Sequence, residues 1–172
     1  VLKRPTAERY NSVTYGTPGG DNQYLHGDFG GPIDSKGRFA YRVNLLAQDG
    51  ETAIDGQVER RHMASVALDW NVSDDLLIQF DASHKQSETR GLTSYWYFAD
   101  QAFRPDAEDL ENDELYSQRW AYNDSRHDRV GSRFQWRLSD VFSLRGALGY
   151  SQYTTEYAYT GPTVNSAGVY VQ

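Results

Sequence analysis

The feature that most constrains this chain is a period-two alternation of apolar and polar residues, sustained over five segments. Alternate side chains of a strand point to opposite faces, so this pattern predicts strands with one apolar and one polar face. No segment has a convincing 3.6-residue period. The pattern therefore predicts an all-β chain. The five segments are Phe39–Gln48, His62–Val72, Leu76–Lys85, Arg129–Leu138 and Phe142–Ser151.

The connections between these strands alternate between short and long. Ser73–Asp75 and Ser139–Val141 are minimal turns, whereas residues 87–127 form a long polar loop between them. Weaker strand signals precede the five, and an eighth strand is expected near Gly168. Short turns on one rim and long loops on the other are typical of transmembrane β-barrels. We expect an antiparallel meander of about 7–8 strands, part of a larger barrel and therefore an open curved sheet.

The short turns also predict register. A tight turn at Ser73 would place Trp70 opposite Leu76 and His62 opposite His84. The turn at Asp140 would place Phe134 opposite Gly146, and a large ring over a strand glycine shields exposed backbone.

Alternation alone also fits a soluble β-sandwich with polar residues in water. The positions of the aromatic residues, which make up 14% of the chain, favour a membrane barrel, because aromatic girdles mark both membrane interfaces. One set clusters at the short-turn rim and comprises Phe39, Trp70, Trp136 and Phe142. A second set crowds toward the long-loop rim and comprises Tyr150, Tyr153, Tyr157 and Tyr159.

Composition and the absence of known motifs argue against several classes of function. The net charge of −7 disfavours a nucleic-acid partner, and the absence of Cys excludes disulfides and thiolate metal sites. The sequence has no nucleophile elbow, P-loop or histidine-based zinc motif. Asp69 and Asp81 are conceivable acid/base partners, and His62 with His84 is a poor metal pair. We therefore expect neither an enzyme nor a metal site.

Several stretches form an ordered pattern along nearly the whole chain: Lys3-Arg4-Pro5-Thr6, Tyr10–Thr14, Asp28–Asp34, Gly37–Asn44, Glu59-Arg60-Arg61 and Trp70 with the Ser-Asp-Asp turn. In their order and spacing, these stretches resemble TonB-dependent siderophore receptors, although Ser12–Gly20 departs from the usual first hairpin of that family.

This resemblance implies part of a barrel of about 22 strands in the outer membrane of a Gram-negative bacterium. Residues 1–9 would end the plug and residues 10–172 would begin the barrel. The whole receptor would bind a ferric siderophore and import it with TonB-coupled energy through a plug outside this chain. Outer-membrane lipid would be a partner, and iron would be chelated cargo rather than a cofactor. A passive porin or structural barrel and a soluble carbohydrate-binding sandwich are the alternatives.

The long loop supplies the candidate ligand-binding residues. Its aromatic run would cradle a chelate through flat apolar rings with polar tips, or it would form a small core that folds the loop. Arginines of the loop would meet an anionic chelate. The candidates are Tyr95, Trp96, Tyr97, Phe98, Trp120, Arg90 and Arg119.

Overall fold

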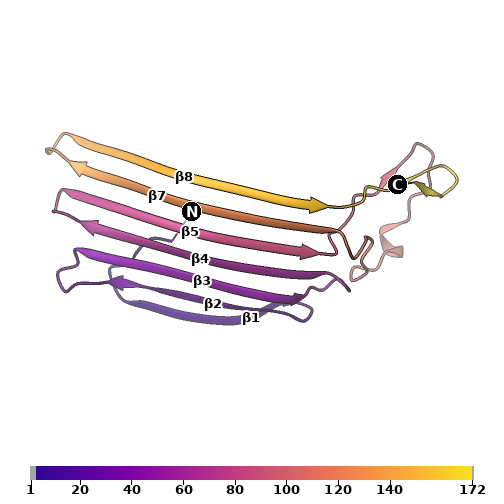
Figure 1. The fold of residues 1–172 in the computed structure, drawn as a ribbon, viewed down its shortest axis with the longest axis horizontal. Helices are drawn as coiled ribbons and strands as arrows, with labels where there is room; N and C mark the ends of the chain where they lie inside the picture. Colours follow the sequence, from indigo (N-terminus) through magenta and orange to yellow (C-terminus); the bar gives the residue numbers. More distant parts are fainter. Residues whose placement is uncertain (1–2, 172) are drawn as a thin grey trace.

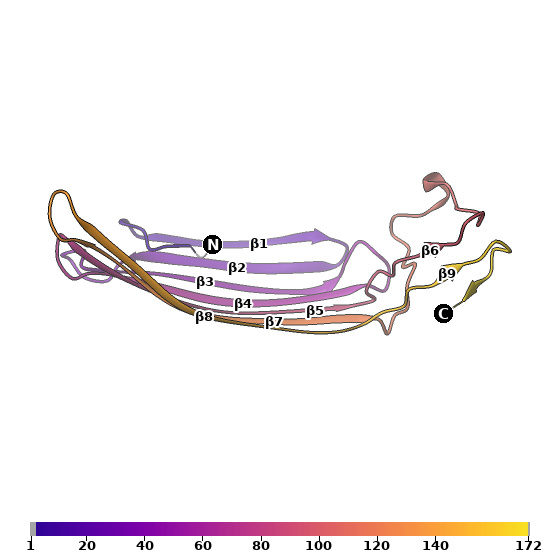
Figure 2. The same ribbon diagram turned by 90° about the horizontal axis from the view of Figure 1, so that it is seen from above.

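The computed structural model describes residues 3–171. Seven antiparallel strands form one sheet in the order β1-β2-β3-β4-β5-β7-β8 (Figure 1). These strands are β1 (Tyr10–Gly19), β2 (Asn22–Pro32), β3 (Phe39–Glu51), β4 (Val58–Asn71), β5 (Leu76–Arg90), β7 (Tyr122–Arg137) and β8 (Ser143–Ala158). Within residues 3–171, β1 and β8 are edges that do not pair with each other, so the sheet is open and curved (Figure 2). The predicted all-β meander and open partial barrel are confirmed.

A smaller sheet stands at the long-loop end of the main one. It consists of β6 (Tyr97–Phe98), β9 (Thr163–Val164) and β10 (Tyr170–Val171), and a 3-10 turn, η1 (Ala107–Asp109), follows β6. No helix in the part of the chain that the structure describes is long and apolar enough to cross a membrane.

The two short hairpins have the same geometry. The Val72 N–H donates to the Leu76 carbonyl at 2.9 Å, as the Leu138 N–H donates to the Phe142 carbonyl at 2.9 Å. The predicted register of the second hairpin is confirmed, with Phe134 opposite Gly146.

The predicted register of the first hairpin is wrong by two residues, because the turn that begins at Ser73 is wider than assumed. Trp70 is opposite Ile78, and His84 is opposite Ala64 rather than His62. The slip is an even number of residues, so every side chain keeps its predicted face.

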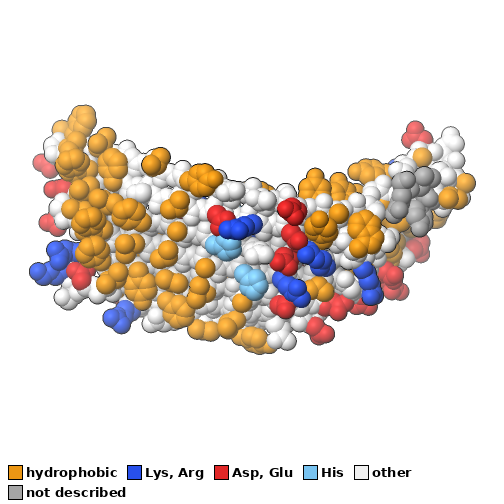
Figure 3. All heavy atoms as spheres, in the orientation of Figure 1, with side chains coloured by type: hydrophobic (Ala, Val, Ile, Leu, Met, Phe, Trp, Pro, Cys, Tyr) orange, Lys and Arg blue, Asp and Glu red, His pale blue; other side chains and the backbone are white. Residues whose placement is uncertain are grey.

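In contrast to a soluble protein, this sheet buries polar side chains and exposes large apolar ones. Polar residues such as Asn44, Gln79 and Asp81 are buried, whereas Val66 and Leu148 are 46% and 82% exposed. Most large apolar side chains lie on the convex face, where Figure 3 shows them densest toward the short-turn end, with charged side chains toward the long-loop end and along the short-turn rim. No second layer covers this face within residues 3–171, so the sandwich alternative is wrong for this part of the chain.

Residues 3–9 form a strap that precedes β1 and lies on the concave side of the sheet (Figure 2). The Lys3 ammonium contacts Asp28 of β2 at 2.7 Å. The Arg4 guanidinium reaches the carbonyl oxygens of Leu68 and Phe80 on β4 and β5, at 3.4 and 3.5 Å. Residues 3–9 therefore cross the polar face rather than the apolar one.

Several strands are longer than predicted at the long-loop end. β5 extends to Arg90 and β7 begins at Tyr122, so the long loop spans residues 91–121 rather than 87–127. Both faces carry polar side chains in this region, which removes the alternation that marks a strand in the sequence. The chain near Gly168 belongs to the small sheet and adds no eighth strand to the main sheet among the residues described. Of the two predicted segments, 1–9 and 10–172, residues 1–2 and 172 lie outside the described residues.

Candidate functional site

Aromatic side chains line the outer half of the concave face. On β8, Tyr153 lies opposite His127, with ring centroids 6.0 Å apart and the rings nearly perpendicular. His127 is two residues from Arg129, whose guanidinium lies 3.7 Å from the buried carboxylate of Asp81. Residues two apart on a strand share a face, so Tyr153 and Tyr157 point to the same side of the sheet as Asp81.

Three tyrosines continue this surface into the loops, and we refer to Tyr95, Tyr157 and Tyr159 as the tyrosine cluster. The Tyr157 and Tyr159 rings stack with centroids 5.7 Å apart, and the Tyr95 ring meets Tyr159 edge-on at 6.3 Å. All three side chains remain exposed, at 69% for Tyr95, 57% for Tyr157 and 46% for Tyr159. Ring faces that are held in place yet open to solvent suit recognition of a flat, partly apolar ligand.

The long loop is tied to the segment that follows β8. β6 pairs in parallel with β9, which places Tyr97 beside Thr163. The Ser94 hydroxyl is within 2.7 Å of the Ser117 hydroxyl and 2.9 Å of the Thr160 hydroxyl. Ser94 is buried, so these two hydrogen bonds join three segments at the base of the loop. Two segments distant in sequence thus form one ordered unit around the tyrosine cluster.

The structure brings some of the predicted loop residues into this unit. Tyr95 belongs to the tyrosine cluster, and Tyr97 lies against Gly161, where an added Cβ would be 3.3 Å from its ring. The Trp96 indole N–H donates to the Tyr116 carbonyl at 2.9 Å. Phe98 lies 5.7 Å beneath the Arg104 guanidinium. Trp96, Tyr97 and Phe98 therefore have packing or hydrogen-bond partners within this unit, and ligand contact by the run stays a prediction.

The remaining predicted residues lie elsewhere. Arg90 forms an ion pair with Asp124 and lies 5.2 Å over the Tyr122 ring, away from the tyrosine cluster. Arg119 lies beside Gly56, in an open hollow whose other charged residues are acidic. Trp120 is 57% exposed. None of these three contacts the predicted aromatic run in the interactions described for residues 3–171.

Tyr153, Tyr157 and Tyr159 were assigned from the sequence to an aromatic girdle, together with Tyr150. The structure corrects this for Tyr153 and Tyr157, which lie on the concave face, whereas Tyr150 is opposite Val130 on the convex face. The sequence already indicated this difference. Tyr153 and Tyr157 are an odd number of positions from Leu148 and Tyr150, and such residues on one strand point to opposite faces.

The inner half of the concave face is charged. Arg42 of β3 forms two hydrogen bonds to Asp28, at 2.6 and 2.8 Å. Asp69 and Asp81, considered from the sequence as acid/base partners, both contact Arg4 of the strap. These carboxylates are thus held in ion pairs, an arrangement that favours a structural role.

The histidine pair is also separated. His84 Nδ1 lies 2.6 Å from an Asp128 carboxylate oxygen, and His62 is opposite Gln86. Among residues 3–171, no group of three His, Cys, Asp or Glu side chains is placed to hold a metal ion.

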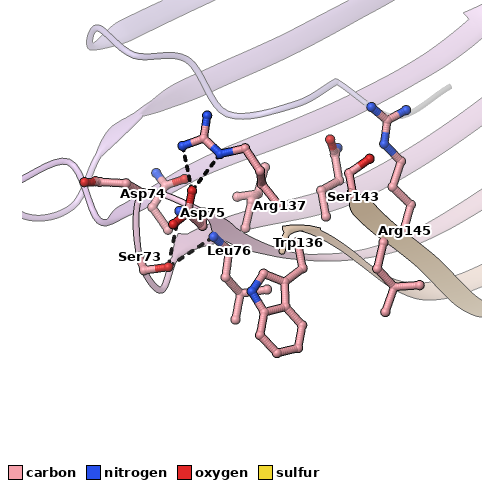
Figure 4. A pocket seen from close by; sticks show the side chains of 12 residues that line it. Ser73, Asp74, Asp75, Leu76, Trp136, Arg137, Ser143 and Arg145 are labelled. Atoms are coloured by element: carbon pink, nitrogen blue, oxygen red, sulfur yellow. Dashed lines mark hydrogen bonds and ion pairs between the residues drawn. The ribbon is translucent and has the colours of Figure 1, made fainter. Parts of the chain in front are cut away.

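A hollow of about 340 Å³ lies at the short-turn rim, at the opposite end of the strands from the tyrosine cluster (Figure 4). Across it, the Arg137 guanidinium pairs with Asp75 at 2.6 Å, and the Leu76 N–H donates to the Ser73 hydroxyl at 3.2 Å. Figure 4 shows the Arg145 side chain standing apart from this pair. These contacts hold the β4–β5 turn against β7, so the hollow is a feature of the turn.

Comparison with known proteins identifies the fold. No family model matches the sequence, and no curated protein sequence matches it. The structure is similar to BauA, the ferric preacinetobactin receptor of Acinetobacter baumannii, with a TM-score of 0.82 over 95% of this chain at 23% identity. It is also similar to the ferripyoverdine receptor of the outer membrane of Pseudomonas aeruginosa, with a TM-score of 0.79 over 91% at 18% identity.

A third similar structure is Fiu, the ferric-catecholate import receptor of E. coli K12, with a TM-score of 0.77 over 96% of this chain at 14% identity. This chain spans 24%, 21% and 26% of the three receptors, in the order given. The sheet therefore has the fold of part of a siderophore-receptor barrel, as the sequence resemblance predicted.

Proposed function

We propose that this chain is part of an outer-membrane receptor that binds a ferric siderophore outside the cell and imports it with TonB-coupled energy. The observation that carries the proposal is that a sheet with the fold of siderophore receptors has one apolar face and one polar face. The uncovered convex face is apolar, and the concave face is polar and crossed by the strap. The apolar convex face suits contact with lipid acyl chains, and the polar concave face suits a water-filled passage.

The tyrosine cluster is the proposed contact surface for the siderophore. It lies at the long-loop end, which in outer-membrane barrels faces the outside of the cell. Siderophore chelates combine flat organic groups with negative charge, and tyrosine rings with hydroxyl tips complement both features. Arg129 and Arg133, whose side chains are 41% and 40% exposed, add positive charge deeper on the same face. Iron enters this scheme as chelated cargo.

The test is uptake of radiolabelled iron by a Gram-negative strain that lacks its own siderophore receptors and expresses the protein carrying this chain. A ferric catecholate, a ferric hydroxamate and a ferric pyoverdine serve as probes. We expect saturable uptake of at least one probe that is lost when the TonB system is deleted. Uptake that rises linearly with concentration and persists without TonB would indicate a passive porin instead. Absence of the protein from the outer-membrane fraction would contradict the membrane assignment.

A further inference from the structure

Charge is divided between the two faces of β5, β7 and β8, the last three strands of the main sheet. Their odd-numbered residues share the concave face with Asp81, and their even-numbered residues share the convex face. The odd positions hold five basic residues and one carboxylate, namely Lys85, Arg129, Arg133, Arg137 and Arg145 against Asp81. The even positions hold two basic residues and four carboxylates, namely Arg90 and Arg126 against Glu88, Asp124, Asp128 and Glu156. The concave side of this arc is therefore positive, in a chain whose net charge is −7.

The positive charge on this face is only partly neutralised. Asp81 is shared by the guanidinium groups of Arg133, Arg4 and Arg129, at 3.2, 3.6 and 3.7 Å. One carboxylate thus faces three cations. Within residues 3–171, the Lys85 ammonium has neither an ion pair nor a hydrogen bond, and its side chain is exposed. Positive charge without a counter-charge on a wall raises the local concentration of anions.

Lys85, His127 and Arg129 lie together on this face, and we refer to them as the basic patch. Lys85 is directly opposite His127 in register, and Arg129 is its diagonal neighbour on β7. Diagonal neighbours of this kind lie about 7–8 Å apart, within reach of long side chains. His127 Nε2 lies 2.7 Å from the Ser151 hydroxyl, which holds the imidazole ring against the wall. The three side chains can therefore converge on one ligand.

Hydroxyl groups, and no carboxylates, surround Lys85 on the concave face. Met63 and His127 are its neighbours across the strands, and neither is acidic. Serines occupy the nearby positions of the same face, namely Ser83, Ser87, Ser125 and Ser151. A hydroxyl group donates a hydrogen bond to an anionic oxygen without adding negative charge of its own. The surroundings of the basic patch therefore suit an anion better than a cation.

From this arrangement we infer that the basic patch is a binding site for an anion that carries its charge on oxygen atoms, such as a carboxylate, phosphate or phenolate group. The Lys85 ammonium and the Arg129 guanidinium supply charge-assisted hydrogen bonds, and His127 supplies a further polar contact. The patch lies inward of the tyrosine cluster on the same face, since Tyr153 is opposite His127. Resting on the proposed function, the inference extends to the cargo: the imported chelate is anionic, and its negative charge is bound here.

The first experiment titrates inorganic phosphate against the purified receptor that carries this chain, in detergent at constant ionic strength. Imidazole resonances of isotope-labelled histidine report binding locally, and the His127 signal is the one missing from His127→Gln. We expect this signal to move saturably with phosphate concentration. Lys85→Gln and Arg129→Gln should each raise the dissociation constant about tenfold, the loss expected for one hydrogen bond to a charged group. A signal that does not move, or an unchanged affinity in Lys85→Gln, would overturn the inference.

Arg126→Gln is the matched control for these variants. Arg126 is adjacent to His127 on β7, but it lies on the convex face and pairs with Asp128 at 2.7 Å. Its replacement removes the same charge and should leave the affinity for phosphate unchanged. Equal weakening in Arg126→Gln would show that phosphate responds to net charge alone and would overturn the inference.

The uptake assay keeps this inference separate from the proposed function. If no ferric siderophore is imported while phosphate still moves the His127 signal, the proposed function fails and the anion site stands. If uptake depends on TonB while phosphate has no effect, the anion site fails and the proposed function stands. Lys85→Gln should also weaken binding of the imported ferric siderophore about tenfold, and this loss should shrink as the salt concentration rises. An unchanged affinity would overturn the extension to the cargo.

Discussion

The ring of Phe134 on β7 covers Gly146 on β8, directly opposite it in register. A Cβ atom added to Gly146 would lie 2.9 Å from the Phe134 Cζ, closer than real Cβ atoms approach other atoms. The neighbours of Gly146 on the same face, Leu144 and Leu148, are exposed. The ring thus occupies the place of the side chain that glycine lacks and shields the strand backbone beneath it.

This contact predicts that Gly146→Ala destabilises the sheet. The added methyl group must displace the ring, and overpacking of this kind costs about 1–3 kcal/mol. The free energy of unfolding, measured by urea titration of the protein in lipid vesicles, checks the value. Adding Phe134→Ala gives the internal control, because the smaller side chain makes room for the methyl group. The double variant should therefore lose less stability than the sum of the two single variants, and simple additivity would contradict the proposed contact.

The assignment of the convex face to lipid predicts a contrast between adjacent residues. Val66 lies on the convex face, and Ser65 lies on the concave face opposite Ser83 and Asn44. Val66→Arg should lower the free energy of unfolding in vesicles by about 2–4 kcal/mol, the cost of a cation on the lipid face near the bilayer midplane. Ser65→Arg places the same charge in a watery interior and should cost much less. Equal costs at the two positions would contradict the assignment.

The sequence predicted the fold well because alternation specifies which residues share a face. Val66 and Asp81 were placed on opposite faces, and the structure confirms both. Alternation does not specify what lies against each face. The positions of the aromatic residues favoured a barrel without a second layer, and the structure has no second layer over Val66 within the residues described.

Register and site were predictable only in part. Aligning Ser73 with Ser139 as the first residue of equivalent turns would have given both registers, because both turns close with the same hydrogen bonds. The contact of Tyr95 with Tyr159 was not predictable, since it joins two loops through tertiary packing. The contact of Arg4 with Asp81 depends in the same way on the path of the strap.

The β2–β3 turn predicts a dependence on pH. Asp34 accepts a hydrogen bond from the Phe39 backbone N–H at 2.9 Å, and this bond holds the pKa of the Asp34 carboxyl below its ordinary value. Because the folded-state pKa is the lower one, the stabilisation is present above the unfolded pKa of about 3.9. It is lost as the pH falls through the folded-state pKa.

The Phe39 amide resonance, followed by NMR during acid titration, should therefore move with a midpoint below about 3.9. Asp34→Asn should abolish this transition. Asp74→Asn is the control, since the Asp74 side chain in the β4–β5 turn has no hydrogen bond in the described part of the chain. A midpoint at or above the unfolded value would show that the bond to Phe39 does not favour the carboxylate.

The tyrosine cluster makes the sharpest prediction about binding, because β8 carries tyrosines on both faces. Tyr157 stacks on Tyr159 on the concave side, whereas Tyr150 is opposite Val130 on the convex side. If the cluster contacts the siderophore, Tyr157→Ala should weaken binding of the imported ferric siderophore about tenfold or more, the loss expected for an aromatic residue central to an interface. Tyr150→Ala removes the same side chain from the other face and should leave the affinity unchanged. Fluorescence quenching or calorimetric titration of the purified receptor measures both. Equal losses at the two positions would point to a general effect on the strand, and no loss in Tyr157→Ala would remove the cluster from the binding surface.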